Sequence, residues 1–307
     1  MSKKLRIFKF SAFSRKQTQI LSWWVDESPV KYFEGIIADG AIRSGKTVSM
    51  SLSFVMWAMN KFSGENFAMC GKTVGSFRRN VWNVLKTMLP SRGFQYIDHK
   101  TDNYIEIIRG NRVNYFYVFG GKDEASQDLI QGITLAGIFF DEVALMPESF
   151  VNQGTGRCSV EGSKYWFNCN PDGPMHWFNQ NWILKAKDKN ILYLHFTMDD
   201  NLSLSEKIKE RYRSMYIGVF FKRYIQGLWA MAEGAIFDMW SEINEISESE
   251  LPRDLKTSAR RYIAIDYGTT NATVFLDIYD DGDIAWVVRE YYYDSKVKMA
   301  QKTDRQY

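Results

Sequence analysis

The feature that most constrains this chain is the segment GAIRSGKT, in which four residues separate Gly40 from Gly45-Lys46-Thr47. An apolar strand pattern, GIIADG, leads into it, and a helical pattern, TVSMSLSFVMWAMNKF, follows it. A strand, a glycine-rich turn and a helix in this order are the context in which such a pattern folds round phosphate groups. The segment therefore predicts a phosphate-binding loop after the first strand of an α/β domain.

Each position of this loop has a chemical role in holding a nucleotide. The glycines allow backbone N–H groups to surround phosphate oxygens, and the following helix adds the positive end of its dipole. Lys46 is placed to contact the β- and γ-phosphates, and the Thr47 hydroxyl to bind magnesium. The alternative is a glycine-rich turn with a surface lysine. We predict that ATP and Mg2+ bind here, with the nucleotide-binding residues Gly40, Arg43, Ser44, Gly45, Lys46 and Thr47.

A pair of acidic residues ends a later apolar segment, LAGIFFDE. Asp141 is placed to support the metal ion, and Glu142 to be the general base that activates water. Acidic pairs at strand ends are common, so this pair indicates a catalytic site only in combination with the phosphate loop upstream. Together the two segments predict ATP hydrolysis, with Glu142 as a catalytic residue and Asp141 as a metal ligand.

Four further side chains are candidates for the same site. Arg43 either stabilises the transferring phosphoryl group from within the loop or points to solvent. Asn168 and Asn170, at the end of KYWFNCNP, either sense the γ-phosphate or belong to an ordinary Asn-Pro turn. Gln17, on the helical pattern SRKQTQILSWW, either reads the adenine edge or lies on a solvated helix face.

Strand-like and helical patterns alternate over residues 35–200, which predicts an α/β domain with a mainly parallel sheet. NFAMCGKT is predicted to be a second strand, VGSFRRNVWNVLKTML an amphipathic helix, and NYIEIIRGNRVNYFYVFGG a hairpin about a Gly-Asn turn. LAGIFFDE, KYWFNCNP and ILYLHFTM complete the buried strands. Aromatic residues make up 16% of the chain, and we expect most of them in the core.

Charge and cysteine content narrow the class of protein. A net charge of +3 does not by itself indicate nucleic-acid binding, although the basic clusters Lys3-Lys4-Arg6 and Arg78-Arg79 could form local patches. The three cysteines have no CxxC spacing, which predicts buried thiols and no zinc site. With no recognisable signal peptide or long apolar segment, the chain is expected to be soluble and intracellular.

The composition changes after residue 240. SEINEISESELPRDLKTSARR is polar, mixed in charge and contains Pro252, which predicts a linker over residues 241–258 between domains at 1–240 and 259–307. Three strands are expected beyond it, with Asp281-Gly282 as the hairpin turn between the last two. The first of them, RRYIAID, ends at Asp266, and a carboxylate in that position often begins a metal or phosphate site.

Six segments, in the same order along the chain, resemble the large subunit of double-stranded DNA phage terminases, in the group found in prophages of Gram-positive bacteria. They are DGAIRSGKT, IQGITLAGIFFDEVALMP, NCNPDGPMHWF, FTMDDNLSLSE, IQGLWAMAEGAIFD and YIAIDYGTT. The resemblance implies an ASCE-type P-loop NTPase domain followed by a ribonuclease-H-like α/β domain. It also implies an ATP-driven motor that docks as a ring on the portal protein of a procapsid and pumps double-stranded DNA inward, in the cytoplasm of the bacterial host. A terminase small subunit is a further implied partner.

The resemblance also assigns site residues. Lys46 and Thr47 fall on the family's phosphate and magnesium contacts, and Asp141 and Glu142 on its metal and base positions. Asn170 lies within the segment that couples hydrolysis to movement, and Gln17 falls near the adenine-reading glutamine. The sequence departs from the family at Cys169, where a small hydroxyl residue is more usual.

The last segment implies a nuclease, in which Asp266 would be the first catalytic ligand of Mn2+ or Mg2+. Two-metal cleavage needs several converging carboxylates, and in this fold the next ones come on a fourth strand and a later helix. We therefore expect an incomplete nuclease domain in this chain. YIAIDYGTT also resembles the first phosphate motif of actin and heat-shock-70 ATPases, but those proteins need a second phosphate loop downstream, so the nuclease interpretation is favoured.

Two other functions stay open on the sequence alone. One is another P-loop DNA translocase or helicase-like ATPase, which would use Lys46 and Glu142 in the same way. The other is an inactive prophage remnant that only binds DNA or portal. The intact phosphate loop and acidic pair argue against loss of ATPase activity.

Overall fold

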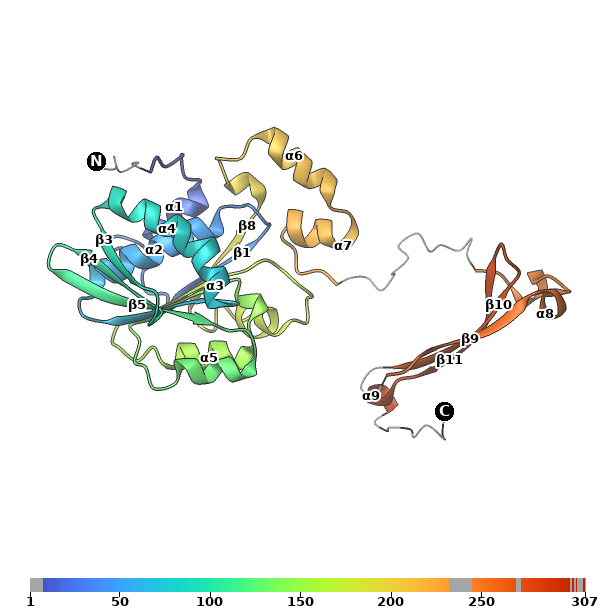
Figure 1. The fold of residues 1–307 in the computed structure, drawn as a ribbon. Helices are drawn as coiled ribbons and strands as arrows, with labels where there is room; N and C mark the ends of the chain where they lie inside the picture. The colour runs from blue at the N-terminus through green and yellow to red at the C-terminus, as the bar shows by residue number, and fades with distance from the viewer. Residues whose placement is uncertain are drawn as a thin grey trace. The chain divides into compact units, whose positions relative to one another are not determined.

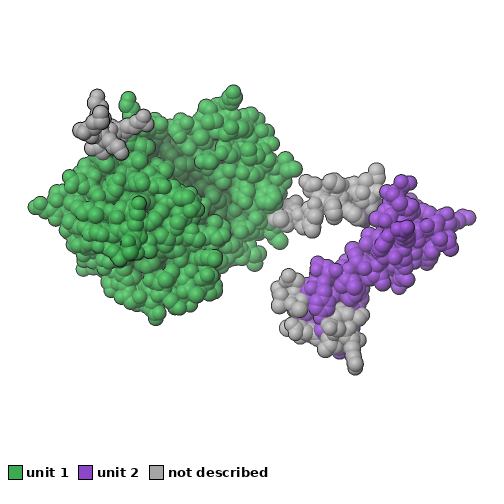
Figure 2. All heavy atoms as spheres, in the orientation of Figure 1, with its two compact units in different colours: residues 1–234 green, residues 235–307 purple. Residues whose placement is uncertain are grey.

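The structure, a computed structural model, describes residues 8–231, 245–268, 272–298, 300, 302 and 306. The chain divides into two compact units, residues 1–234 and residues 235–307 (Figures 1 and 2). Within the described ranges, no helix combines the length and the apolar character that crossing a membrane requires.

The first unit is built on an eight-stranded sheet with the order β3-β4-β5-β2-β6-β7-β1-β8. The pairs from β5 to β8 are parallel, and β3, β4 and β5 form an antiparallel extension. This confirms the predicted mainly parallel α/β sheet, in which β7 lies between β1 and β6. The strands are β1 (Gly35–Gly40), β2 (Asn66–Gly71), β3 (Gln95–His99), β4 (Tyr104–Arg109), β5 (Arg112–Gly120), β6 (Gly137–Asp141), β7 (Lys164–Asn168) and β8 (Ile191–Phe196).

The three helical patterns that the sequence predicted are confirmed with one difference, and α5, α6 and α7 were not predicted. The amphipathic segment after β2 forms α3 and α4, and a π-helical turn over Arg78–Trp82 separates them. Within this turn the Arg78 guanidinium (2.8 Å) and the Trp82 indole (2.9 Å) both donate to Asp98 on β3, a strand that the sequence patterns did not predict. The α-helices are α1 (Arg15–Ser22), α2 (Lys46–Lys61), α3 (Val74–Phe77), α4 (Asn83–Met88), α5 (Glu148–Gly156), α6 (Glu206–Met215) and α7 (Gly218–Phe220).

Aromatic side chains fill the core, as expected: the twelve largest fully buried side chains of the first unit are all Trp or Phe. On α2, Phe54 and Trp57 both pack on Trp166 of β7, with ring centroids 5.2 and 4.7 Å apart. The Ser53 hydroxyl, also on α2, donates to the Ile20 carbonyl of α1 at 2.6 Å and accepts from the Trp166 indole at 3.3 Å. These contacts fix α2, and with it the phosphate loop, on the sheet.

The second unit contains an antiparallel sheet with the order β11-β10-β9. Its turn lies at Asp281-Gly282, as predicted: Gly282 has φ +100°, and the Asp281 carboxylate accepts the Ile284 N–H at 2.8 Å. Within the predicted linker, residues 241–244 lie outside the described residues, and the linker's bounds stay a prediction. The elements are α8 (Leu255–Ser258), β9 (Arg260–Asp266), β10 (Thr273–Asp280), β11 (Ala285–Tyr293) and α9 (Ser295–Lys298).

The packing between β6 and α2 gives a test of the fold. A Cβ atom on Gly137 would lie 2.6 Å from the Trp57 ring and 3.1 Å from the Lys164 carbonyl oxygen. We expect Gly137→Ala to lower the free energy of unfolding by about 1–3 kcal/mol, the usual cost of overpacking a core. Denaturant unfolding of the chain measures this change.

The matched control is Gly156→Ala at the end of α5, where no atom lies within 4 Å of an added Cβ among the described residues. The control is expected to leave the unfolding free energy unchanged or raise it slightly. Equal stability of the two variants would contradict the close approach of β6 to α2.

Candidate nucleotide-binding site

The phosphate loop connects the end of β1 to the start of α2, and its backbone turns through three positive φ angles. These are +124° at Gly40, +58° at Arg43 and +83° at Gly45. Glycine adopts such angles freely, whereas an arginine there is strained. The Asn201 side-chain amide donates to the Arg43 carbonyl at 2.7 Å and helps to hold this conformation. The loop thus has the open curvature that lets backbone N–H groups face a ligand.

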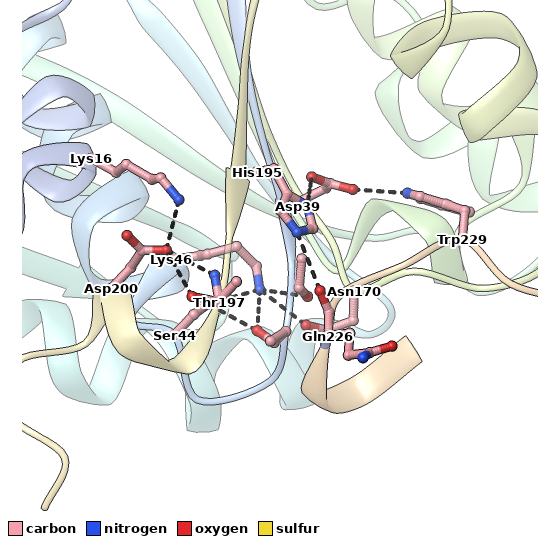
Figure 3. Close-up of polar contacts among 12 residues, drawn as sticks. Lys16, Asp39, Ser44, Lys46, Asn170, His195, Thr197, Asp200, Gln226 and Trp229 are labelled. Atoms are coloured by element: carbon pink, nitrogen blue, oxygen red, sulfur yellow. Dashed lines mark hydrogen bonds and ion pairs between the residues drawn. The ribbon is translucent and has the colours of Figure 1, made fainter. Parts of the chain in front are cut away.

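Lys46, the first residue of α2, is buried, and its ammonium group points back across the loop (Figure 3). Its Nζ atom donates to the carbonyl oxygens of Gly40 (3.0 Å) and Ala41 (2.7 Å). It also donates to Ser44 Oγ and to Asn170 Oδ1, each at 3.1 Å. Burial lowers the pKa of Lys46 to about 8. The geometry brings together residues that the sequence placed in separate motifs.

Asp141, Thr47 and Asn168 form a second cluster beside the loop. The Thr47 hydroxyl donates to Asp141 Oδ1 at 3.2 Å. The Asn168 amide donates to Thr47 Oγ1 at 2.9 Å and also to the Asp141 carboxylate. Burial raises the pKa of Asp141 to about 6, and the hydrogen bond from Asn168 opposes that rise. The ends of β6 and β7 therefore present their polar side chains to the start of α2.

This second cluster fits a magnesium ion. The Asn168 Oδ1 atom is buried and has no hydrogen-bond partner within the part of the chain that the structure describes. Mg2+ prefers oxygen ligands and usually takes one or two protein groups, several waters and the phosphates of its nucleotide. Thr47 and Asp141 could supply the two protein oxygens, and Asn168 Oδ1 could accept from a water on the ion; the role of Thr47 and Asp141 as metal ligands stays a prediction.

Glu142 follows β6 with φ +60°, a left-handed conformation that is uncommon for glutamate. Strained backbone at such a position marks functional sites. Glu142 lines a cavity of about 410 Å³ together with the phosphate loop, Asp141, Asn168 and Asn170. The position supports its predicted role as general base, which stays a prediction.

The cavity also has lining residues that the sequence did not single out: Asn80, Val84 and Asn201. Asn80 lies in the π-helical turn, a feature that often marks functional sites. That turn interrupts an ordinary amphipathic pattern, so no local signal in the sequence indicated Asn80. Asn201 lies in FTMDDNLSLSE, a segment whose resemblance identified the family but assigned no role to this residue.

The positions of Arg43 and Gln17 bear on whether each side chain faces solvent or the nucleotide site. The Arg43 Nε atom donates to the Tyr212 hydroxyl of α6 at 3.1 Å, so its role toward a phosphoryl group stays a prediction. Gln17 is buried and does not lie on a solvated helix face. Its Nε2 atom lies 2.3 Å from where a Cβ on Gly45 would be. Gln17 therefore packs on the loop, and its contact with adenine stays a prediction.

Asp266 ends β9 in the second unit, where its backbone pairs with Val274 and its side chain is exposed. Within the described ranges of the chain, no three His, Cys, Asp or Glu residues converge as a metal site. The role of Asp266 as a nuclease ligand stays a prediction.

The parallel sheet, the phosphate loop with its buried lysine and the acidic pair at the end of β6 define a P-loop ATPase domain of the ASCE type. Residues 37–242 match the family model for the N-terminal part of the T4-like-virus-type terminase large subunit. This chain belongs to the phage terminase large subunits, as the sequence motifs implied. Its placement in the Gram-positive prophage group stays a prediction.

Solved structures support the same assignment. The large terminase of a thermophilic bacteriophage is 56% identical, with 97% of this chain and 72% of that chain covered and a TM-score of 0.72. The same phage terminase in complex with ATP-gamma-S is 53% identical, with 96% of this chain and 72% of that chain covered and a TM-score of 0.70. The large terminase of bacteriophage HK97 is 13% identical, and the match covers 96% of this chain and 67% of that chain. Its TM-score of 0.54 supports the fold alone. No curated protein matches this chain.

The Asp141 cluster gives a test of the site by pKa. In the metal-free protein, carboxyl carbon NMR is expected to show Asp141 with a pKa of about 6, so the carboxylate is charged above that pH and protonated below it. Asn168→Ala removes a hydrogen bond that favours the charged form. The pKa of Asp141 is therefore expected to rise further in this variant.

Asn179→Ala is the control, because Asn179 is also buried but donates to the Pro174 carbonyl at 2.7 Å and does not contact Asp141. If the pKa of Asp141 changes equally in both variants, or in neither, the hydrogen bond from Asn168 to Asp141 is contradicted.

Proposed function

We propose that this chain is the ATP-hydrolysing motor subunit that packages double-stranded phage DNA into a procapsid. The observation that carries the proposal is the position of Lys46, whose buried ammonium lies between the phosphate loop and Asn170. Family membership supports it, as does the terminase of the thermophilic bacteriophage, which has been solved with ADP and with ATP-gamma-S.

The loop binds ATP by exchanging internal partners for phosphate oxygens. Lys46 gives up the carbonyls of Gly40 and Ala41 and contacts the β- and γ-phosphates, while loop N–H groups surround them. Thr47 and Asp141 would hold Mg2+, which would neutralise charge on the phosphates. Gln17, packed on Gly45, is proposed to contact the adenine.

Hydrolysis requires a water aligned with the γ-phosphate and a base to take its proton. Glu142, at the end of β6 and on the cavity wall, is proposed as this base. Arg43 is proposed to leave Tyr212 and stabilise the phosphoryl group as charge develops. Asn168 and Asn170 also line this cavity, and they are proposed to sense whether the γ-phosphate is present.

Asn170 is the proposed coupling residue, since its Oδ1 atom accepts from Lys46 at 3.1 Å. Phosphate oxygens compete for the same ammonium, so nucleotide binding releases Asn170, and departure of the products after hydrolysis restores the contact. Asn168 contacts Thr47 and Asp141 and would respond to the metal ion. Asn170 is thus proposed to sense the γ-phosphate through Lys46, and Asn168 to sense it through the metal ion that the phosphates help to hold.

DNA is the substrate that family membership implies. We propose the portal protein and the terminase small subunit as partners, and a ring of several copies on the portal as the working assembly. We further propose that the second unit belongs to a ribonuclease-H-like nuclease in which Asp266 binds Mn2+ or Mg2+. Manganese-dependent cleavage of plasmid DNA that survives Asp266→Ala would contradict this last role.

Lys46→Ala and Glu142→Gln are expected to separate binding from hydrolysis. Lys46→Ala removes the main cationic contact and is expected to abolish both ATP-gamma-S binding and ATP turnover. Glu142→Gln keeps the site's shape but removes the base, so binding persists while kcat falls about 10²- to 10⁴-fold. Calorimetry and steady-state phosphate release measure the two quantities.

The control is Glu161→Gln, an exposed acid that does not line the cavity. Its ATP turnover is expected to equal that of the unchanged protein. Turnover that persists in Lys46→Ala would contradict the ATPase assignment.

Packaging and general DNA translocation predict different requirements. A packaging motor is expected to protect DNA from nuclease only when procapsids that carry a portal are present with ATP. Procapsids without portal serve as the control. ATP-driven movement along DNA that is independent of portal would favour the helicase-like alternative.

A further inference from the structure

Asp39, the residue before Gly40 on β1, is a fully buried carboxylate to which the proposed ATPase chemistry assigns no role. Its Oδ2 atom accepts from the Trp229 indole N–H at 2.8 Å, and its Oδ1 atom lies 3.2 Å from His195 Nδ1 (Figure 3). The hydrogen bond to Asp39 raises the pKa of His195. A buried carboxylate is costly unless it is paired, so these partners make Asp39 a specific anchor.

Trp229 belongs to residues 224–230, which we call the strap. The strap's backbone lies directly on the phosphate loop. The Tyr224 carbonyl accepts the Ile42 N–H at 2.9 Å. A Cβ atom added to Gly227 would lie 2.6 Å from Ala41 N and 2.7 Å from Gly40 Cα. Only glycine fits here, both for this close approach and for its φ of +73°.

The strap and Lys46 act on the same two loop residues. Gly227 packs on Gly40 and Ala41, whose carbonyl oxygens hold the Lys46 ammonium. The Gln226 carbonyl also lies 3.3 Å from His195 Nε2, so Asp39 and the strap share His195 as a partner. A phosphate that replaces the carbonyls of Gly40 and Ala41 as a partner of Lys46 therefore alters the same loop residues on which Gly227 packs.

The strap is also connected to the segment that follows β7. Arg223, the residue before the strap, donates to the Asp172 carboxylate at 2.6 Å and to the Ala230 carbonyl at 2.9 Å. Asp172 comes two residues after Asn170, the proposed coupling residue. Along the chain, the strap is followed by residues 231–244 and then by the described part of the second unit.

We propose that Asp39 is a positioning residue that fastens the strap to the phosphate loop, so that nucleotide binding at Lys46 and docking of the strap stabilise each other. This inference rests on the proposed function, because it requires the loop to bind ATP. The strap orders the loop before the nucleotide arrives, which lowers the cost of binding. Because such coupling is reciprocal, bound nucleotide also holds the strap in place.

The test compares Trp229→Phe with the unchanged chain, using ATP-gamma-S as the probe. The variant keeps an aromatic ring but loses the N–H that Asp39 accepts. Its dissociation constant for ATP-gamma-S is expected to rise about fivefold or more. Hydrogen exchange in peptides covering residues 221–231 is expected to slow with ATP-gamma-S in the unchanged chain and to lose that response in Trp229→Phe.

Trp182→Phe is the matched control, a buried tryptophan that packs on Phe167 with ring centroids 4.6 Å apart and lies outside the strap. It is expected to keep both the affinity and the exchange response. Asp39→Asn provides a second variant, expected to weaken ATP-gamma-S binding in the same direction; if it does not fold, Trp229→Phe decides.

The inference is overturned if Trp229→Phe and Trp182→Phe have the same affinity for ATP-gamma-S and the same hydrogen exchange. It is also overturned if ATP-gamma-S does not change the hydrogen-exchange rate of the strap in the unchanged chain. Failure of the proposed function has a different signature, because then Lys46→Ala would also leave ATP-gamma-S affinity unchanged. A loss of binding in Lys46→Ala, with no effect in Trp229→Phe, removes only the role of Asp39.

Discussion

The buried ammonium of Lys46 is the interaction on which the rest of the site depends. A charged amine out of water is costly unless it is fully hydrogen-bonded, and here two loop carbonyls, a hydroxyl and an amide oxygen accept from it. The phosphate loop must keep its curvature for those carbonyls to converge. The curvature of the loop and the position of the Lys46 ammonium therefore depend on each other.

The order of strands explains how distant residues reach that cation. In a parallel sheet the carboxyl ends of the strands lie at one edge, where ligands bind. Because β7 lies between β1 and β6, its last residue Asn168 and the following Asn170 are placed between the phosphate loop and the acidic pair. The same arrangement lets Asn168 contact Asp141 while Asn170 contacts Lys46. One edge of one sheet thus brings together the residues proposed for nucleotide binding, catalysis and sensing.

The sequence was informative where chemistry is local. The phosphate loop, the acidic strand end and the Asp281-Gly282 turn each occupy a few consecutive residues, so their residue types alone indicated their structure. The unpredicted features depend on contacts between distant segments. Asp39 and Trp229 are 190 positions apart, and although each lies in a segment that resembles the family, nothing in either segment indicated that the two residues contact each other. Likewise β3 has mostly half-exposed side chains, and its place at the sheet edge follows from pairing with β4.

The central claim is that Lys46 exchanges its internal partners for nucleotide phosphates. A crystal structure of the chain with ATP-gamma-S and Mg2+ tests it most directly. The account predicts Lys46 Nζ at about 3 Å from β- and γ-phosphate oxygens, separated from Asn170, with Thr47 and Asp141 beside the metal ion. Nucleotide bound elsewhere, with Lys46 still on the carbonyls of Gly40 and Ala41, would contradict the account.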